Sequence, residues 1–124
     1  MIRFAPTRHD LVEVRAVRAW EQSGHHRLSV FADVPQCDES EESHLLARLI
    51  EAAGYEGVNL ETNKWFFVCQ ASALLRHGFA FEKDGYPNER PEHYSVNIGP
   101  EEPQLRPMSV CLYLTAFADK RSLG

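Results

Sequence analysis

Short β-rich runs alternate with segments of helical spacing along the chain, and this order constrains the fold more than any other feature. Residues 27 to 34, RLSVFADV, have the composition of a strand that Pro35 stops. Residues 40 to 53 follow, with leucines at helical spacing and carboxylates in the first turn, which predicts a well-marked helix. The alternation predicts an α/β or α+β sandwich in which about three helices cover a mixed, mainly antiparallel sheet.

The remaining elements are predicted from the same signals. Asp10 and Glu13 have the spacing of a capping box at the start of a helix. Residues 108 to 118 fit either a helix that Pro107 begins or an edge strand, and both interpretations stay open. Helices are expected over 11 to 22 and over 70 to 78 (QASALLRHG). Strands are expected over 2 to 7 (IRFAPT), 57 to 61 (GVNLE), 79 to 85 (FAFEKDG) and 93 to 99 (HYSVNIG).

Length and charge exclude several classes of protein. A chain of 124 residues supports one hydrophobic core, so we expect a single domain over residues 1 to 124. The net charge of -5 and the lack of a basic run argue against nucleic acid as a partner. No stretch approaches the roughly eighteen apolar residues of a membrane helix, and the start lacks the apolar core of a signal peptide. We therefore expect a cytoplasmic protein without a membrane span.

The cysteines and histidines show no metal-ligand spacing. Three cysteines are widely separated and form no C-x-x-C pair, so we expect reduced thiols and no metal. If a helix begins near Thr62 or Asn63, Cys69 lies well inside it, away from the N-terminal dipole that lowers a thiol pKa. Cys69 is then expected to be a packed thiol rather than a nucleophile.

Three segments resemble, in the same order, parts of the GCN5-related N-acetyltransferase family. They are MIRFAPTRHDLVEVRAVRAW, HLLARLIEAAGYEGVNLETN and ASALLRHGFAFEKDG. The resemblance implies an acyl-CoA N-acyltransferase-like fold, in which acetyl-CoA enters an opening between two central strands and its pyrophosphate meets the amides at the start of the central helix. The matching strands would be Leu28 to Val34 and Gly57 to Glu61, and the helix would begin within Cys37 to Ser43.

The resemblance also implies a reaction: an amine attacks the thioester of acyl-CoA once a general base has removed its proton. Residue type and presumed strand ends make Glu61 and His26 candidate bases, with His25 as an alternative. Tyr94 is the candidate acid, with Tyr86 as an alternative. The residues expected to contact the cofactor lie on the first matching strand and at the corner after the second: Val30, Phe31, Ala32, Val34 and Asn63.

The turn before the central helix differs from the family's glycine-bearing turn. It reads QCDESEES, and the carboxylates between Asp38 and Glu42 would repel a pyrophosphate. The alternative is a small non-catalytic module, such as an inhibitor, antitoxin or regulator, that recognises a basic protein partner through this acidic segment. Residues 65 to 67, Trp-Phe-Phe, are expected in the core, and their exposure would instead favour a protein-binding or base-stacking surface.

Overall fold

The computed structural model describes residues 1–4, 9–23, 26–83, 91–99 and 102–123, which form one six-stranded sheet and four helices. The strands are β1 (Ile2–Arg3), β2 (His26–Phe31), β3 (Trp65–Val68), β4 (Ala80–Lys83), β5 (His93–Gly99) and β6 (Asp119–Ser122). The helices are α1 (His9–Ser23), α2 (Glu42–Tyr55), α3 (Ala71–Arg76) and α4 (Glu102–Ala116). The strand order is β4-β5-β2-β1-β3-β6, and each neighbouring pair is antiparallel.

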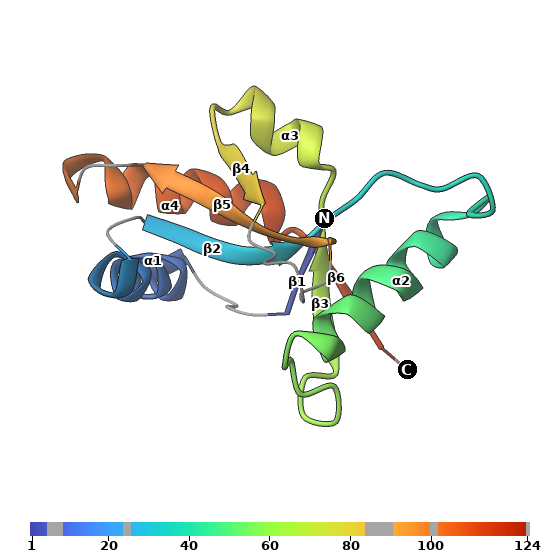
Figure 1. Ribbon diagram of the computed structural model, residues 1–124. Coiled ribbons are helices and arrows are strands. Elements are labelled where there is room, and N and C mark those ends of the chain that lie inside the picture. Colours follow the sequence, from blue (N-terminus) through green and yellow to red (C-terminus); the bar gives the residue numbers. More distant parts are fainter. Residues whose placement is uncertain (5–8, 24–25, 84–90, 100–101, 124) are drawn as a thin grey trace.

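The helices are divided unequally between the two faces of the sheet. Because neighbouring strand residues point to opposite faces, Val30 packs in one core cluster and Phe31 in the other. The first cluster holds buried side chains of α1, α3 and α4, and the second holds those of α2. Figure 1 accordingly shows α2 apart from the other three helices, next to β3 and β6.

The α+β class is confirmed, and two details of the expectation are corrected. There are four helices among the described residues instead of about three, and the sheet is wholly antiparallel instead of mixed. The additional helix is α4, which settles the open interpretation of residues 108 to 118. Leu112 and Ala116 are buried while Leu114 between them is exposed, so the apolar pattern follows a helical period and not strand alternation. Pro107 lies inside this helix and not at its start.

Residues 57 to 61 were predicted as a strand, and this prediction was wrong. Gly57 has a φ of 103°, a conformation that side-chain-bearing residues rarely adopt. The side-chain oxygen of Asn59 then accepts hydrogen bonds from the N–H groups of Glu61 and Thr62, at 3.0 and 3.3 Å. This Asx turn satisfies the backbone locally, so the segment makes no sheet ladder. The strand itself begins later, at Trp65.

The aromatic run is divided between core and surface. Phe66 and Phe67 are buried on opposite faces of β3, as expected for core residues. Trp65 is 51% exposed, and the Lys120 ammonium lies 5.0 Å from its ring centroid. The core expectation is thus confirmed for the two phenylalanines and wrong for the tryptophan.

The ends of other elements shift by a few residues. The strand expected over 27 to 34 ends at Phe31, and the helix expected over 40 to 53 spans 42–55. The helix expected over 11 to 22 spans 9–23, so Asp10 lies within it; the side chains of Asp10 and Glu13 are outside the described part of the structure.

The two interpretations of residues 108 to 118 have different consequences for stability. Leu112 is 1% exposed and Leu114, on the same helix, is 68% exposed. We expect Leu112→Ala to lower the free energy of unfolding by about 2–5 kcal/mol, because it leaves a cavity in the core. Leu114→Ala should change it by less than about 0.5 kcal/mol. Urea unfolding of both variants measures this, and equal losses would contradict a helix in this orientation.

Candidate functional site

A cavity of about 820 Å³ opens at the carboxyl ends of β2 and β3. The segment after β2, Ala32–Pro35, leads to α2, and the segment after β3, Cys69–Ser72, leads to α3; both segments line the cavity. Since α2 and α3 cover opposite faces of the sheet, the two connections diverge here. Divergence of connections at strand carboxyl ends creates a crevice, and in open α/β sheets such crevices are where ligands bind.

The walls of this cavity are mainly apolar. Helix α2 contributes Leu45, Leu46 and Leu49, and the sheet contributes Val68, Phe81 and Tyr94. The charged side chains that line it come from the segment after β2, from the first turn of α2 and from β6: Asp33, Glu42, Asp119 and Arg121. A pocket with apolar walls and a few polar groups is the usual form of a small-molecule site.

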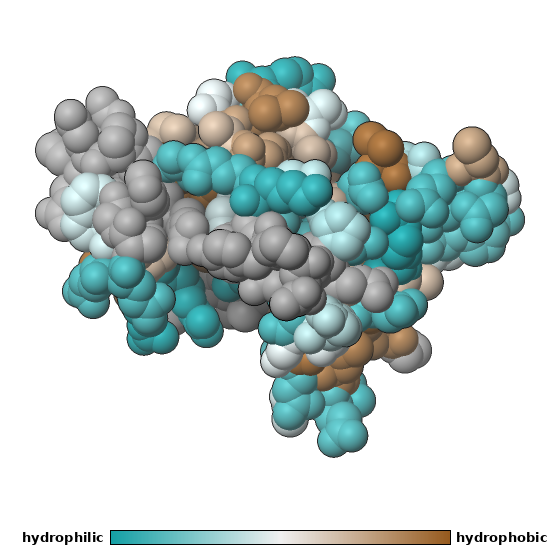
Figure 2. Space-filling model, in the orientation of Figure 1, coloured by the Kyte–Doolittle hydropathy of each residue, from teal (hydrophilic) through white to brown (hydrophobic). Residues whose placement is uncertain are grey.

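The surface near the cavity is mixed in character. In Figure 2 a hydrophobic patch lies over α3, where Leu75 is exposed, and hydrophilic surface covers much of the exposed side of the β2–α2 loop and α2. Within that loop Val34 is nevertheless exposed while it lines the cavity. The apolar lining of the cavity therefore reaches the protein surface at Val34, next to the hydrophilic surface of the loop.

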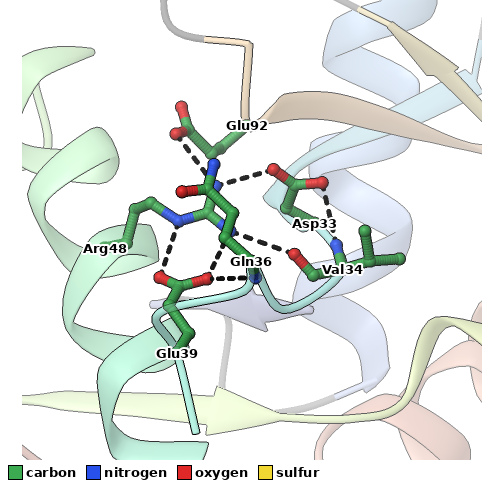
Figure 3. Close-up of polar contacts among 6 residues, drawn as sticks. All are labelled: Asp33, Val34, Gln36, Glu39, Arg48 and Glu92. Atoms are coloured by element: carbon green, nitrogen blue, oxygen red, sulfur yellow. Dashed lines mark hydrogen bonds and ion pairs between the residues drawn. The ribbon is translucent and has the colours of Figure 1, made fainter.

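One arginine of α2 holds the segment after β2 in place (Figure 3). Arg48 donates to both carboxylate oxygens of Glu39 at 2.9 Å, and to Asp33 at 2.6 Å. It also donates to the buried Glu92 at 3.3 Å and to the carbonyl of Val34 at 3.1 Å. A fork of donors shared among these acceptors fixes the cavity wall against α2.

These hydrogen bonds change the acidity of the carboxyl groups. Hydrogen bonds from Arg48 and from the N–H of Gln36 lower the pKa of Glu39 to about 2. Burial alone would raise the pKa of Asp33, but the hydrogen bonds from Arg48 and the N–H of Val34 hold it below its ordinary value. Both groups therefore favour the carboxylate form in the folded protein.

The structure brings three of the predicted site residues together. Ala32, Val34 and the candidate acid Tyr94 all line the cavity. Val30 and Phe31, also predicted to contact the cofactor, are instead buried in the core clusters on either face of the sheet.

The other predicted residues lie elsewhere. Glu61 and Asn63 belong to the Asx turn, where the Asn63 amide donates to the carbonyl of Asn59 at 2.8 Å, and neither lines the cavity. His26 begins β2, at the end remote from the cavity, and its side chain lies outside the described part of the structure. His25 and Tyr86 are also outside the described residues. The candidate base Glu61 is therefore not placed beside the candidate acid Tyr94.

The opening expected between two neighbouring central strands is not formed as the resemblance implied. Residues 57 to 61 are a turn, and β2 pairs with β1 and β5 instead. Cys69 is also not inside a helix: it follows β3, and its backbone exchanges hydrogen bonds with Met1 at 2.9 and 3.0 Å. Its side chain lines the cavity, and burial raises the pKa of the thiol, which keeps it protonated near neutral pH.

The sequence interpretation missed two arginines that organise the site. Arg48 is the only charged residue within LLARLI, directly after an acidic segment, and this isolated charge was the available signal. Arg121 binds Glu42 across 79 positions of sequence, and no local pattern indicates such a pair. Because Glu39 binds Arg48 and Glu42 binds Arg121, part of the acidic segment is already neutralised within the chain.

Comparison with known protein families, curated proteins and solved structures found no match. In the described ranges no group of three or more histidine, cysteine or acidic side chains is arranged to hold a metal ion. No helix among the described residues combines the length and apolar character needed to cross a membrane.

The Arg48 contacts predict how stability depends on pH. A carboxyl whose pKa is lower in the folded protein stabilises it above its unfolded pKa, and this contribution disappears as the pH falls through the folded pKa. For Glu39 that decline runs from about pH 5 to about pH 2. We expect Arg48→Met to lower the free energy of unfolding at pH 7, and the difference from wild type to shrink steadily below pH 5.

Urea unfolding between pH 7 and pH 2.5 measures this difference. Arg18→Met, at an exposed position of α1, is the control for loss of one positive charge. A wild-type-to-Arg48→Met difference that does not depend on pH would contradict the assignment.

Proposed function

We propose that this protein is a binding domain whose cavity between α2 and α3 takes a small, mainly apolar molecule. The observation that carries the proposal is the cavity itself: about 820 Å³, lined mainly by apolar side chains and located where the connections after β2 and β3 diverge. Pockets that hold small molecules commonly have volumes of about 300–1,000 Å³.

The construction of the walls supports a preformed site. Leu46 and Leu49 are buried in the core cluster under α2 while also lining the cavity, so their positions are set by core packing. On the opposite side, Arg48 holds the segment from Asp33 to Glu39 against the same helix. A site whose lining is ordered before binding loses less conformational entropy when the ligand enters.

The proposal is tested by filling the cavity. Ser72 is exposed on α3 and lines the cavity, whereas Leu75 is exposed on the same helix and does not line it. We expect 1-octanol to bind the wild type and to shift the backbone amide signals of residues 69–72 in a nitrogen-15 NMR titration. Ser72→Trp should weaken this binding at least about tenfold, because the indole occupies the cavity.

Leu75→Trp is the matched control, since it adds the same side chain on the same helix outside the cavity. It should bind the probe as the wild type does. Saturable binding that Ser72→Trp leaves unchanged, or no binding by the wild type, would refute the proposed site.

Acyl transfer is a second candidate, and the observation that favours it is the position of Tyr94. This predicted acid shares the cavity with Ala32 and Val34, two of the residues expected to contact acetyl-CoA. Within an acyl-CoA N-acyltransferase-like fold, the thioester would lie in the cavity and Tyr94 would protonate the departing thiolate. The phosphates of the cofactor are harder to accommodate, since α2 begins at Glu42, directly after an acidic segment that contains no glycine.

This candidate predicts that millimolar acetyl-CoA raises Tm by several degrees, because a ligand at a hundred times its Kd stabilises the folded state by about 2.7 kcal/mol. Tyr94→Phe should keep the rise in Tm and lower the transfer rate to an amine at least about a hundredfold. Differential scanning calorimetry and a thiol-release assay make the two measurements. Acetyl-CoA without effect on the wild-type Tm would eliminate acyl transfer and leave the binding proposal standing.

A further inference from the structure

We infer that the cavity selects a ligand with one positive charge, and that Arg121 is a resident cation which such a ligand displaces from Glu42. This inference rests on the proposed binding function and names the chemical class of the ligand: an apolar molecule that bears an ammonium group.

The geometry of Arg121 divides its guanidinium between two carboxylates. Nε and Nη2 donate to the two oxygens of Asp119, at 3.2 and 2.8 Å, which is a bidentate contact within β6. Nη1 alone donates to Glu42, in the first turn of α2. Since Asp119 holds Arg121 through two hydrogen bonds, the single bond to Glu42 can be exchanged while Arg121 stays on β6.

The three side chains are accessible enough for such an exchange. Arg121 is 37% exposed, Asp119 50% and Glu42 60%. All three line the cavity, so an ammonium group at its mouth can reach the Glu42 carboxylate while the apolar part of the ligand lies among the leucines. Exposed ion pairs of this kind contribute little to stability, and their partners can be replaced at small cost.

The charges around the cavity favour a cation over an anion. Among the described residues, the charged groups that line it are three carboxylates (Asp33, Glu42 and Asp119), the guanidinium of Arg121 and the N-terminal ammonium of Met1. Burial lowers the pKa of this ammonium, which weakens its positive charge, so the carboxylates still outnumber the cations. Directly behind the wall, Arg48 shares its single positive charge between Asp33, one of these three carboxylates, and the carboxylate of Glu39. The lowered pKa values of Asp33, Glu39 and Asp119 keep these groups ionised at neutral pH. An anionic ligand would therefore meet net repulsion at a mouth that attracts a cation.

An ammonium group also suits the exchange better than a second guanidinium. It is a compact charge with three N–H donors that can rotate, so it can bind one carboxylate while water takes its other donors, whereas a guanidinium binds best to acceptors that lie in its plane. The plane of acceptors at Asp119 is already occupied by Arg121. Glu42, 60% exposed, thus offers a carboxylate that an ammonium group can bind while its other donors stay hydrated.

The test compares three eight-carbon probes: octylamine, 1-octanol and octanoate. Binding is measured by nitrogen-15 NMR titration of the full chain at low ionic strength. We expect wild-type protein to bind octylamine more tightly than octanoate. Arg121→Met should raise the affinity for octylamine up to about fivefold, the factor that corresponds to an exposed ion pair of about 1 kcal/mol, because the competing cation is removed. The affinity for 1-octanol should stay unchanged.

Two variants separate the local effect from net charge. Lys120→Met is the matched control, since Lys120 lies beside Arg121 on β6, carries the same charge and does not line the cavity. It should leave octylamine binding unchanged. Glu42→Gln should weaken octylamine binding and leave 1-octanol binding unchanged, because the carboxylate that receives the ammonium group is lost. In the Glu42→Gln background, Arg121→Met should raise octylamine affinity less than it does in the wild type.

The outcomes distinguish this inference from the proposed function. If 1-octanol binds but octanoate binds as tightly as octylamine, or if Arg121→Met weakens octylamine binding, the charge selection is refuted and the binding function stands. An equal gain with Lys120→Met would also refute it, because net charge would then explain the effect. If none of the three probes binds, the proposed function and this inference both fail.

Discussion

Two residues join the halves of the sheet. Ile2 pairs with Phe31 of β2 on one side and with Val68 of β3 on the other, and Arg3 pairs with Phe67. Without β1, the strands β4-β5-β2 and the pair β3-β6 would have no ladder in common. Ile2 is fully buried in the cluster under α2, so the packing of this one side chain supports a junction too short to be stable through its hydrogen bonds alone.

The same junction creates the candidate site. Because β1 lies between β2 and β3 and is antiparallel to both, these two strands run in the same direction. Their carboxyl ends therefore lie at the same end of the sheet. The chain then leaves β2 toward one face and β3 toward the other, which separates α2 from α3. The cavity occupies the space that neither helix covers. Two ion pairs border this space: Arg48 binds Asp33 behind one wall, and Arg121 binds Glu42 among the lining residues.

Sequence periodicity was sufficient where an element satisfies its own pattern over several turns or residues. The helix α2 and the strand β5 were predicted within a few residues. The leucines of α2 recur at helical spacing and HYSVNIG alternates as a strand does, so each segment carries its own signal. Periodicity failed at residues 57 to 61, where the Asn59 side chain competes with the sheet for backbone hydrogen bonds. It also could not distinguish strand from helix in α4, since Leu112, Leu114 and Ala116 fit both periods until tertiary contacts select which are buried.

The candidate site was less predictable than the fold because its residues meet through long-range contacts. Ala32, Val34 and Tyr94 were named from the sequence, yet their meeting depends on the pairing of β2 with β5. The partners of Arg48 and Arg121 lie up to 79 positions away, and electrostatic pairs of this separation leave no periodic trace. The acidic segment could be recognised as acidic, but not as one whose charges are partly matched from within the chain.

The strand β6 forms one outer edge of the described sheet, and its residues have a consequence beyond the cavity. An exposed edge offers its backbone groups to strands of other molecules and can seed edge-to-edge assembly. Here the edge carries Asp119, Lys120 and Arg121 in succession. A second copy that paired with β6 would have to remove water from these charged side chains on both faces of the extended sheet. Asp119 and Arg121, which line the cavity, are therefore also side chains that oppose edge-to-edge pairing of this sheet with an identical chain.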